Sequence, residues 1–316
     1  MAGSRLSDIA SSLGLNIATV SRALRDDPRV RPETRERVRS EADRLGYRPH
    51  VAARALAEGR TRTLWFIIPD LEDAIAREPA WHASQILLDL GYDLLLAQHH
   101  NDEAVFERTL NRLSRGGADG AIIIPDASSQ GTADAWLWDS QVPFVYLDRR
   151  LDGTFTAPVV TTDNAAATEA LVAALVSSSP GGKPDLVVNA FGAPHTNSVE
   201  TVRRAAVDEA AGRLGFPVVH PPSPIPACRR PLVLASSEAT ALDWVSRLGN
   251  PESVGIGVFD SWRSGLRPLT RVFVAVQDFR AMAALAVERV MGQMGQEPDR
   301  LPTIDLIPLA RMEEIQ

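Results

Sequence analysis

The chain has 316 residues, of which 45% are hydrophobic, and this balance excludes a disordered or fibrous protein and predicts two or three domains. Its longest strongly apolar runs, 64–68 and 121–124, are much shorter than the ~20 residues of a membrane span, so we expect no membrane contact. The single Cys228 excludes an intrachain disulfide and a thiolate zinc site, and the first residues lack the apolar stretch of a secretion signal. We therefore expect a cytoplasmic protein with no metal and no cofactor.

The net charge of −7 is distributed unevenly along the chain. Residues 1–60 contain 12 arginines and 8 acidic residues, whereas the rest of the chain contains 21 basic and 32 acidic residues. Because a positive segment attracts the phosphates of nucleic acid, we expect the N-terminal segment to contact DNA.

The first 46 residues show no strand pattern and three short helical patterns, at 7–13, 17–24 and 32–45. Gly14 can adopt the left-handed conformation that ends the first helix, and the side chain of Asn16 can cap the amides that begin the second. Pro32 suits the first turn of the third helix, which would complete a small core. Two helices that meet at so tight a turn predict a helix-turn-helix DNA-binding domain.

The second of these helices is expected to read the bases. At ~100° per residue, Val20, Ala23 and Leu24 point toward the core. The opposite arc holds the residues that we expect to contact DNA: Ile17, Ala18, Ser21, Arg22 and Arg25. Arg22 is the strongest candidate, since an arginine can donate two hydrogen bonds to a guanine, worth ~1–3 kcal/mol of discrimination. The alternative is a merely solvated arginine, the usual role on an isolated amphipathic helix.

From residue 64 onward, β-branched strands alternate with longer helical segments, which predicts a parallel α/β architecture. Nine strands suit two open sheets better than one; we predict them at 64–68, 93–97, 121–124, 144–147, 159–161, 186–190, 232–234, 254–259 and 273–276. Residues 161–164 are a natural crossing point between two lobes, with Asp163 as the N-cap of the next helix.

Five N-terminal motifs are specific enough to indicate a family. They are Asp-Ile-Ala at 8–10, Thr-Val-Ser-Arg-Ala-Leu at 19–24, Thr-Arg-Glu-Arg-Val at 34–38, Leu-Gly-Tyr-Arg-Pro at 45–49 and Ala-Ala-Arg-Ala-Leu at 52–56. Together they strongly resemble the LacI/GalR family of bacterial regulators. The last motif looks like the family's hinge helix, and the resemblance implies that Ala53 and Leu56 enter the minor groove of DNA, with Leu56 as an apolar wedge between base steps. The alternative is that both form the buried face of an ordinary linker helix.

The resemblance also implies the domain organisation. We expect an all-α helix-turn-helix headpiece at 1–46, a hinge helix and linker at 47–60, and a two-lobed effector-binding and dimerisation domain at 61–316. This last domain would be an α/β core of periplasmic-binding-protein-like fold with two Rossmann-like lobes. The N-lobe would take about 61–161 plus part of 280–316, and the C-lobe about 162–279.

Open parallel sheets bind ligands at the carboxyl ends of their strands, so polar and aromatic side chains there are candidates for an effector pocket. The candidates are Asp70, Asp148, Arg149, Arg203, Glu238, Asp260, Trp262 and Phe279. The resemblance aligns Arg203 with the arginine that anchors the effector and Asp260 with a second polar anchor, a pair that suits a ligand with hydroxyls or a carboxylate. The alternatives are an interlobe ion pair between Arg203 and Asp260, a helix cap at Glu238 and simple packing of Trp262.

No motif predicts catalysis. Gly255-Ile256-Gly257 lacks the third glycine of a dinucleotide fingerprint. His99 and His100 lack the spacing and companion acids of a metal site, and we expect both at the surface.

We therefore expect a transcriptional regulator, in particular a repressor, that binds a pseudo-palindromic operator as a homodimer and responds to a small, carbohydrate-like effector. The sequence leaves open whether the effector releases or strengthens DNA binding. The alternatives are a regulator that has lost effector sensing and a solute-binding protein built on the same lobes.

Overall fold

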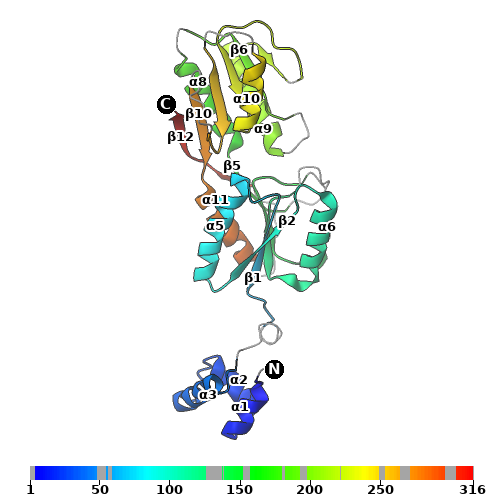
Figure 1. The fold of residues 1–316 in the computed structure, drawn as a ribbon, viewed down its shortest axis with the longest axis vertical. Coiled ribbons are helices and arrows are strands. Elements are labelled where there is room, and N and C mark those ends of the chain that lie inside the picture. Colours follow the sequence, from blue (N-terminus) through cyan, green and yellow to red (C-terminus); the bar gives the residue numbers. More distant parts are fainter. Residues whose placement is uncertain are drawn as a thin grey trace. The chain divides into compact units, whose positions relative to one another are not determined.

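The computed structural model describes most of the chain (Figure 1). The described residues are 4–47, 55, 59–125, 137, 139–151, 157–179, 182–192, 198–220, 222–248, 253–263, 271–295 and 304–315. The chain divides into two compact units, residues 1–61 and 62–316, and each is described by itself. Across the described ranges, none of the helices combines the length and the apolar character needed to traverse a bilayer.

Between residues 4 and 47 the first unit forms the helices α1 (Leu6–Leu13), α2 (Ile17–Leu24) and α3 (Pro32–Arg44). α1 ends because Gly14 takes a φ of +64°, and α2 begins where the Asn16 side chain accepts a hydrogen bond of 2.8 Å from the Ala18 amide. Apolar side chains from the helices and from the loop before α3 meet in one core, made of Ile9, Ala10, Val20, Ala23, Val30, Val38 and Ala42. This core fixes which face of α2 points outward.

The second unit contains two parallel-rich sheets, each with six described strands. The first sheet has the order β11-β5-β4-β3-β1-β2, with β1 (Thr63–Ile68), β2 (Asp93–Gln98), β3 (Gly120–Ile123), β4 (Phe144–Leu147), β5 (Val159–Thr162) and β11 (Ile304–Ile307). The second sheet repeats this order as β12-β10-β9-β8-β6-β7, with β6 (Leu186–Asn189), β7 (Val218–Val219), β8 (Pro231–Leu234), β9 (Gly255–Phe259), β10 (Val272–Gln277) and β12 (Leu309–Ile315). Among the described pairs, only β10 and β12 run antiparallel. The expected α/β core of two Rossmann-like lobes is confirmed.

Helices cover both faces of each sheet, which is why the strands are apolar on both sides. On the first sheet, α5 (Ala74–Asp89) and α11 (Phe279–Gln293) share one core with Leu64, Phe66 and Ile68 of β1. α6 (Glu103–Arg112) and the turn Leu113–Gly117 pack on the opposite face, against Trp65 and Ile67. On the second sheet, α8 (Asn164–Ser177) and α9 (Ser198–Leu214) cover one face and α10 (Glu238–Arg247) covers the other.

The chain passes between the two sheets three times, from β5 to α8, from β10 to α11 and from β11 to β12. The first two passages begin alike, since Asp163 caps α8 and Asp278 caps α11 through hydrogen bonds of 3.1 and 2.8 Å to helix amides. They also contact each other, because the Thr162 hydroxyl at the end of β5 donates to the side-chain oxygen of Gln277 at the end of β10. The ends of these two strands are therefore held together beside the pocket described below.

His99 does not lie at the surface, so our expectation for this residue is wrong. Its ring is fully buried, 5.0 Å from the ring of Phe106, and its Nε2 lies 3.1 Å from the carbonyl oxygen of Ile124. Its Nδ1 accepts a hydrogen bond from the amide of Asn101. A neutral imidazole satisfies both contacts, one as donor and one as acceptor, so neither ring nitrogen is buried without a hydrogen bond. His100, by contrast, is largely exposed.

Candidate functional site

α2 has one buried and one exposed face. Val20 and Ala23 are buried in the core of the first unit. The residues predicted to contact bases share the opposite face, where Ile17, Ala18, Arg22 and Arg25 are exposed and Ser21 is half-buried. The two residues predicted to enter the minor groove, Ala53 and Leu56, lie outside the described residues.

Four other described arginines of the first unit form ion pairs with acidic neighbours, namely Arg29, Arg35, Arg39 and Arg44. Arg29 lies 2.7 Å from a carboxylate oxygen of Asp27, and Arg44 lies 2.6 Å from Glu41. Hydrogen bonding to Arg29 holds the pKa of Asp27 far below its ordinary value, and hydrogen bonding to Arg44 lowers the pKa of Glu41 to about 2. The Arg22 side chain makes no hydrogen bond or ion pair with the described residues, so its guanidinium is available to a partner.

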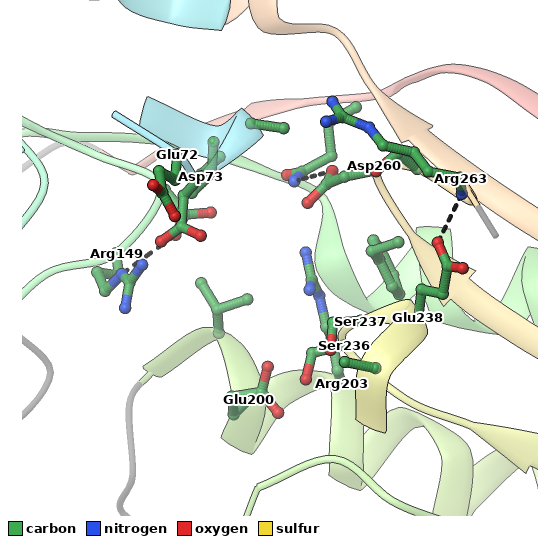
Figure 2. Close-up of a pocket in the computed structure, with 18 residues that line it drawn as sticks. Glu72, Asp73, Arg149, Glu200, Arg203, Ser236, Ser237, Glu238, Asp260 and Arg263 are labelled. Carbon is green, nitrogen blue, oxygen red and sulfur yellow. Dashed lines mark hydrogen bonds and ion pairs between the residues drawn. The ribbon is translucent and has the colours of Figure 1, made fainter. Parts of the chain in front are cut away.

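A cavity of about 380 Å³ lies where the carboxyl ends of strands from both sheets approach each other (Figure 2). Its volume is within the roughly 300–1,000 Å³ of ordinary small-molecule sites. The predicted effector residues that line it are Asp148, Arg149, Arg203, Glu238 and Asp260. The other described lining residues are Glu72, Asp73, Ala74, Ile75, Val199, Glu200, Ser236, Ser237, Ala239, Phe259, Ser261, Arg263 and Gln277.

Asp148 and Asp260 occupy equivalent positions in the two sheets, directly after β4 and β9. Both have positive φ angles, +68° and +71°, although neither is glycine. In each case the amide of the following residue donates to the carbonyl of the preceding one, at 2.8 and 2.9 Å, which closes a γ-turn. An L-residue held in this conformation is strained by about 1–3 kcal/mol, and such strain concentrates at ligand sites. The two turns place both carboxylates at the wall of the cavity.

Arg203 is a buried cation on the C-lobe side of the cavity. Its side chain is only 4% exposed, its Nε donates to Asn164 at 2.7 Å, and its guanidinium lies 3.5 Å from the centre of the Phe259 ring. Burial lowers the pKa of Arg203, and the nearby carboxylates of Asp260 and Asp148 oppose that effect. The two Nη atoms make no hydrogen bond with the described residues, and the side chain points into the cavity (Figure 2). They are donors available to a ligand.

Asp260 faces the same cavity and is tied to the passage between the lobes. Gln277 donates from Nε2 to its Oδ1 at 2.6 Å, and Gln277 in turn accepts from Thr162. Burial raises the pKa of Asp260 to about 6, because it penalises the carboxylate more than Arg203 and the Gln277 hydrogen bond stabilise it. Arg203 and Asp260 do not form an ion pair, so the simple interlobe ion pair is wrong as an explanation for these residues.

Glu238 is the first residue of α10, but it is not the cap of that helix. Ser237 has this role, since its hydroxyl accepts from the Thr240 amide at 3.3 Å. The Glu238 carboxylate instead accepts from the backbone amide of Arg263 at 2.5 Å, across the rim of the cavity (Figure 2). The helix-cap alternative for Glu238 is therefore wrong.

Three predicted effector residues do not line this cavity. Asp70 accepts a hydrogen bond from the Glu72 amide at 3.0 Å and lies 3.6 Å from His100. Phe279 packs against the core between the first sheet and α11. Trp262 packs against the core that includes Ala241 and Trp244 of α10, as the packing alternative expects.

Sequence reasoning missed several polar residues of the cavity, above all Asp73 and Glu200. Glu200 stands three residues before Arg203 on α9, so the two share a helix face, and this spacing could have revealed it. Asp73 looks like an ordinary helix cap in the sequence. Its carboxylate nevertheless makes no capping hydrogen bond to α5, and no sequence pattern shows this.

Comparison with known proteins relates both units to bacterial regulators. Residues 5–50 match the family described as "Bacterial regulatory proteins, lacI family". The chain is 32% identical over 171 residues to catabolite control protein A of Priestia megaterium, a match that covers 54% of this chain and 51% of the relative. It is 33% identical over 177 residues to the HTH-type transcriptional regulator MalR of Streptomyces coelicolor, covering 55% and 50%. The chain spans about half the length of these curated relatives.

Solved structures extend the likeness in fold to the whole chain. The Lac repressor dimer bound to operator and the anti-inducer ONPF aligns with a TM-score of 0.76 at 16% identity, covering 99% of this chain and 98% of that one. The Cra transcriptional dual regulator of Pseudomonas putida, in complex with fructose 1-phosphate, aligns with a TM-score of 0.64 at 22% identity, covering 80% and 98%. The predicted fold class, a helix-turn-helix headpiece followed by a periplasmic-binding-protein-like core, is confirmed. By the match of residues 5–50, the N-terminal helices of this chain are similar to those of the lacI family of bacterial regulatory proteins.

Proposed function

We propose that this chain is a sequence-specific DNA-binding transcriptional regulator that acts as a repressor. As a homodimer it binds a pseudo-palindromic operator, with α2 of each copy in a major groove and Ala53 and Leu56 of each copy in the minor groove between them. A small polar ligand in the cavity of the second unit controls this binding.

The main support for DNA binding is the exposed face of α2. Ile17 is 51% exposed, and Arg22, exposed on the same side of α2, makes no hydrogen bond or ion pair with the described residues. A large apolar side chain in water gains nothing for stability, but it can contact a thymine methyl group, while an arginine can bond the edge of a guanine. Base contact therefore explains both side chains at once.

The cavity supports control by a small molecule. It brings together the open donors of Arg203 and the carboxylate of Asp260, which suit a ligand rich in hydroxyl groups. Among the structures of similar fold, that of Cra is a complex with fructose 1-phosphate. We propose a sugar-like effector for this chain too. Such a ligand changes operator affinity only to the extent that it binds the DNA-competent and DNA-incompetent states unequally.

Substitution of Arg22 tests the DNA-binding proposal. The operator is first selected from a random duplex pool with the full-length protein, and binding is then followed by fluorescence anisotropy at several salt concentrations. We expect affinity to fall steeply with salt, and Arg22→Ala to lower operator affinity by about 10- to 100-fold while reducing discrimination against unrelated DNA.

The matched control is Arg44→Ala, which removes a headpiece arginine that is already paired with Glu41. This variant should keep the sequence preference of the parent protein. Failure to enrich any sequence, or an operator affinity that Arg22→Ala leaves unchanged, would contradict the proposal.

A further inference from the structure

The cavity contains more negative than positive side chains. Its described lining includes six carboxylates, those of Glu72, Asp73, Asp148, Glu200, Glu238 and Asp260. It includes three guanidiniums, those of Arg149, Arg203 and Arg263. Arg149 is engaged by Asp148 at 3.2 Å, so one of these cations is already neutralised within the wall. A phosphate ester would enter this cavity against the repulsion of the remaining acids.

Asp73 is a lining carboxylate that its own helix does not use. It stands at the N-cap position of α5, as Asp163 and Asp278 do for α8 and α11. Those two aspartates cap their helices at 3.1 and 2.8 Å, whereas Asp73 makes no side-chain capping bond. Its charge also contributes to the raised pKa of Asp260, so it acts on the interior of the cavity. The carboxylate is thus free for a ligand rather than used by its helix.

The acids come from opposite sides of the cavity. Glu72 and Asp73 follow β1 in the first lobe, and Glu200 lies in the first turns of α9 in the second lobe (Figure 2). Like charges that face each other across a cleft repel, and a cation between them replaces this repulsion with attraction on both sides. A cationic ligand would therefore stabilise the arrangement in which the two lobes lie close together.

The cavity also carries built polar groups for an uncharged part of the ligand. Arg203 is only 4% exposed. Its Nη atoms have no hydrogen-bond partner among the described residues, and its side chain points into the cavity (Figure 2). Asp260 and Gln277 lie beside them, joined at 2.6 Å. Phe259 is the one aromatic residue in the described lining, and Arg203 covers its face at 3.5 Å. These groups can bind the hydroxyls of a ligand, whereas a sugar ring cannot stack on Phe259 because Arg203 covers that ring.

We infer that the cavity selects a small polyhydroxylated ligand that carries a protonated amine, an amino sugar in chemical class, and disfavours phosphorylated sugars. The ammonium group lies among Asp73, Glu72 and Glu200, and the hydroxyls contact Arg203 and Asp260. This inference rests on the proposed function, in which the cavity binds the effector.

Matched pairs of sugars test the inference on the full-length chain by isothermal titration calorimetry. The probes are glucosamine with glucose, galactosamine with galactose, mannosamine with mannose, and glucose 6-phosphate. We expect at least one amine to bind about tenfold or more tightly than its neutral parent, with weaker binding at high salt, and no binding of the phosphate ester. Equal or tighter binding of the neutral sugars, tighter binding of the phosphate ester, or no binding of any amine overturns the inference.

Charge-removing variants test the placement of the amine. Asp73→Asn and Glu200→Gln should each weaken binding of the amine about tenfold and so reduce its advantage over the neutral parent. Glu209→Gln is the matched control, since it removes an exposed carboxylate from the same helix as Glu200. An amine preference that survives both cavity substitutions refutes the placement, and thermal melting of each variant shows whether it is folded.

Operator binding by the same preparations separates this inference from the proposed function. If the protein selects an operator through Arg22 but shows no amine preference, the inference fails and the regulator remains. If no DNA sequence is selected although an amino sugar binds, the proposed regulator fails and the cavity assignment remains.

Discussion

Arg203 and Asp260 show how one buried environment shifts two opposite charges. Burial destabilises both ionised forms, lowering the pKa of Arg203 and raising that of Asp260. Each partner offsets part of the effect on the other, but the two do not approach to ion-pair distance. The site thus holds a carboxyl group that changes charge near neutral pH beside a cation with unused donors. Such groups are typical of sites that bind a polar ligand.

The raised pKa of Asp260 makes a prediction for stability. Folding favours the protonated carboxyl, because its pKa rises from the ordinary 3.8 to about 6. The stability from this group is therefore fully present below about pH 4 and is lost as the pH rises through about 6. Asp260→Asn removes this dependence, so the variant should gain roughly 2–3 kcal/mol in unfolding free energy relative to the parent between pH 4 and pH 7. Urea denaturation at both pH values measures the difference; a constant difference would rule out the burial effect.

The candidate site was predictable from the sequence only in part. The positions after the strands of a parallel sheet are known once the strands are known, and this led to Asp148 and Asp260. The orientation of a side chain at such a position depends on the local turn, which sequence reasoning does not supply. Asp73 was missed and Phe279 chosen for this reason, since the first turns into the cavity and the second into the core.

At the scale of elements, the apolar strands were the most predictable feature. Each of the nine predicted strands is present with both ends within one residue. All of them except the edge strand β2 are largely buried, and buried strands form short apolar runs between polar turns. β7, β11 and β12 were missed. β7 has only two residues, and β11 and β12 are edge strands in which exposed residues interrupt the apolar pattern. Their positions depend on partners that are distant in sequence.

The glycines of β9 lead to a second stability prediction. A Cβ atom on Gly257 would lie 2.9 Å from Leu175 and 3.0 Å from Leu171, both on α8. Gly257 therefore lets α8 approach the sheet closely. This packing role accounts for the glycine without a nucleotide-binding site. We expect Gly257→Ala to lower the unfolding free energy by about 1–3 kcal/mol through overpacking.

Gly212→Ala is the matched control for this prediction. Gly212 lies in α9, and a Cβ there would meet nothing within 4 Å. This substitution should raise the unfolding free energy by about 0.5–1 kcal/mol, because alanine is the better helix former. Urea denaturation of both variants decides the matter: equal effects of the two substitutions would exclude close packing at Gly257.

At the scale of the whole molecule, one surface of the first lobe is suited to a second copy of the chain. Trp81 (59% exposed) and Leu88 (68%) lie seven residues apart on α5, and they are followed by Leu90 (49%) at its C-terminal end and by Leu96 (42%) on β2, which pairs with Phe66 and so faces the same side of the sheet as α5. An exposed apolar cluster of this kind marks an interaction surface, and the proposed pseudo-palindromic operator requires two copies. We therefore propose this surface as the dimer interface.

Leu88→Arg tests the interface. A charge buried against an apolar partner should weaken the dimer by about 30-fold or more, and operator binding should weaken with it. Leu214→Arg, at an exposed leucine of the second lobe, is the control and should leave the dimer intact. Sedimentation velocity over a range of protein concentrations distinguishes the variants. A dimer that Leu88→Arg does not weaken would place the interface elsewhere.

The three passages between the sheets have a consequence for biosynthesis. The first sheet starts at Thr63 but gains its last strand only at Ile307, and α11, whose Met282 and Val290 fill its core, comes from the same late part of the chain. Translation must therefore deliver almost the entire polypeptide before either lobe can complete its interior. While the ribosome is still at work, the early strands emerge with an uncovered apolar face, and this is the period in which the nascent protein most needs protection from aggregation.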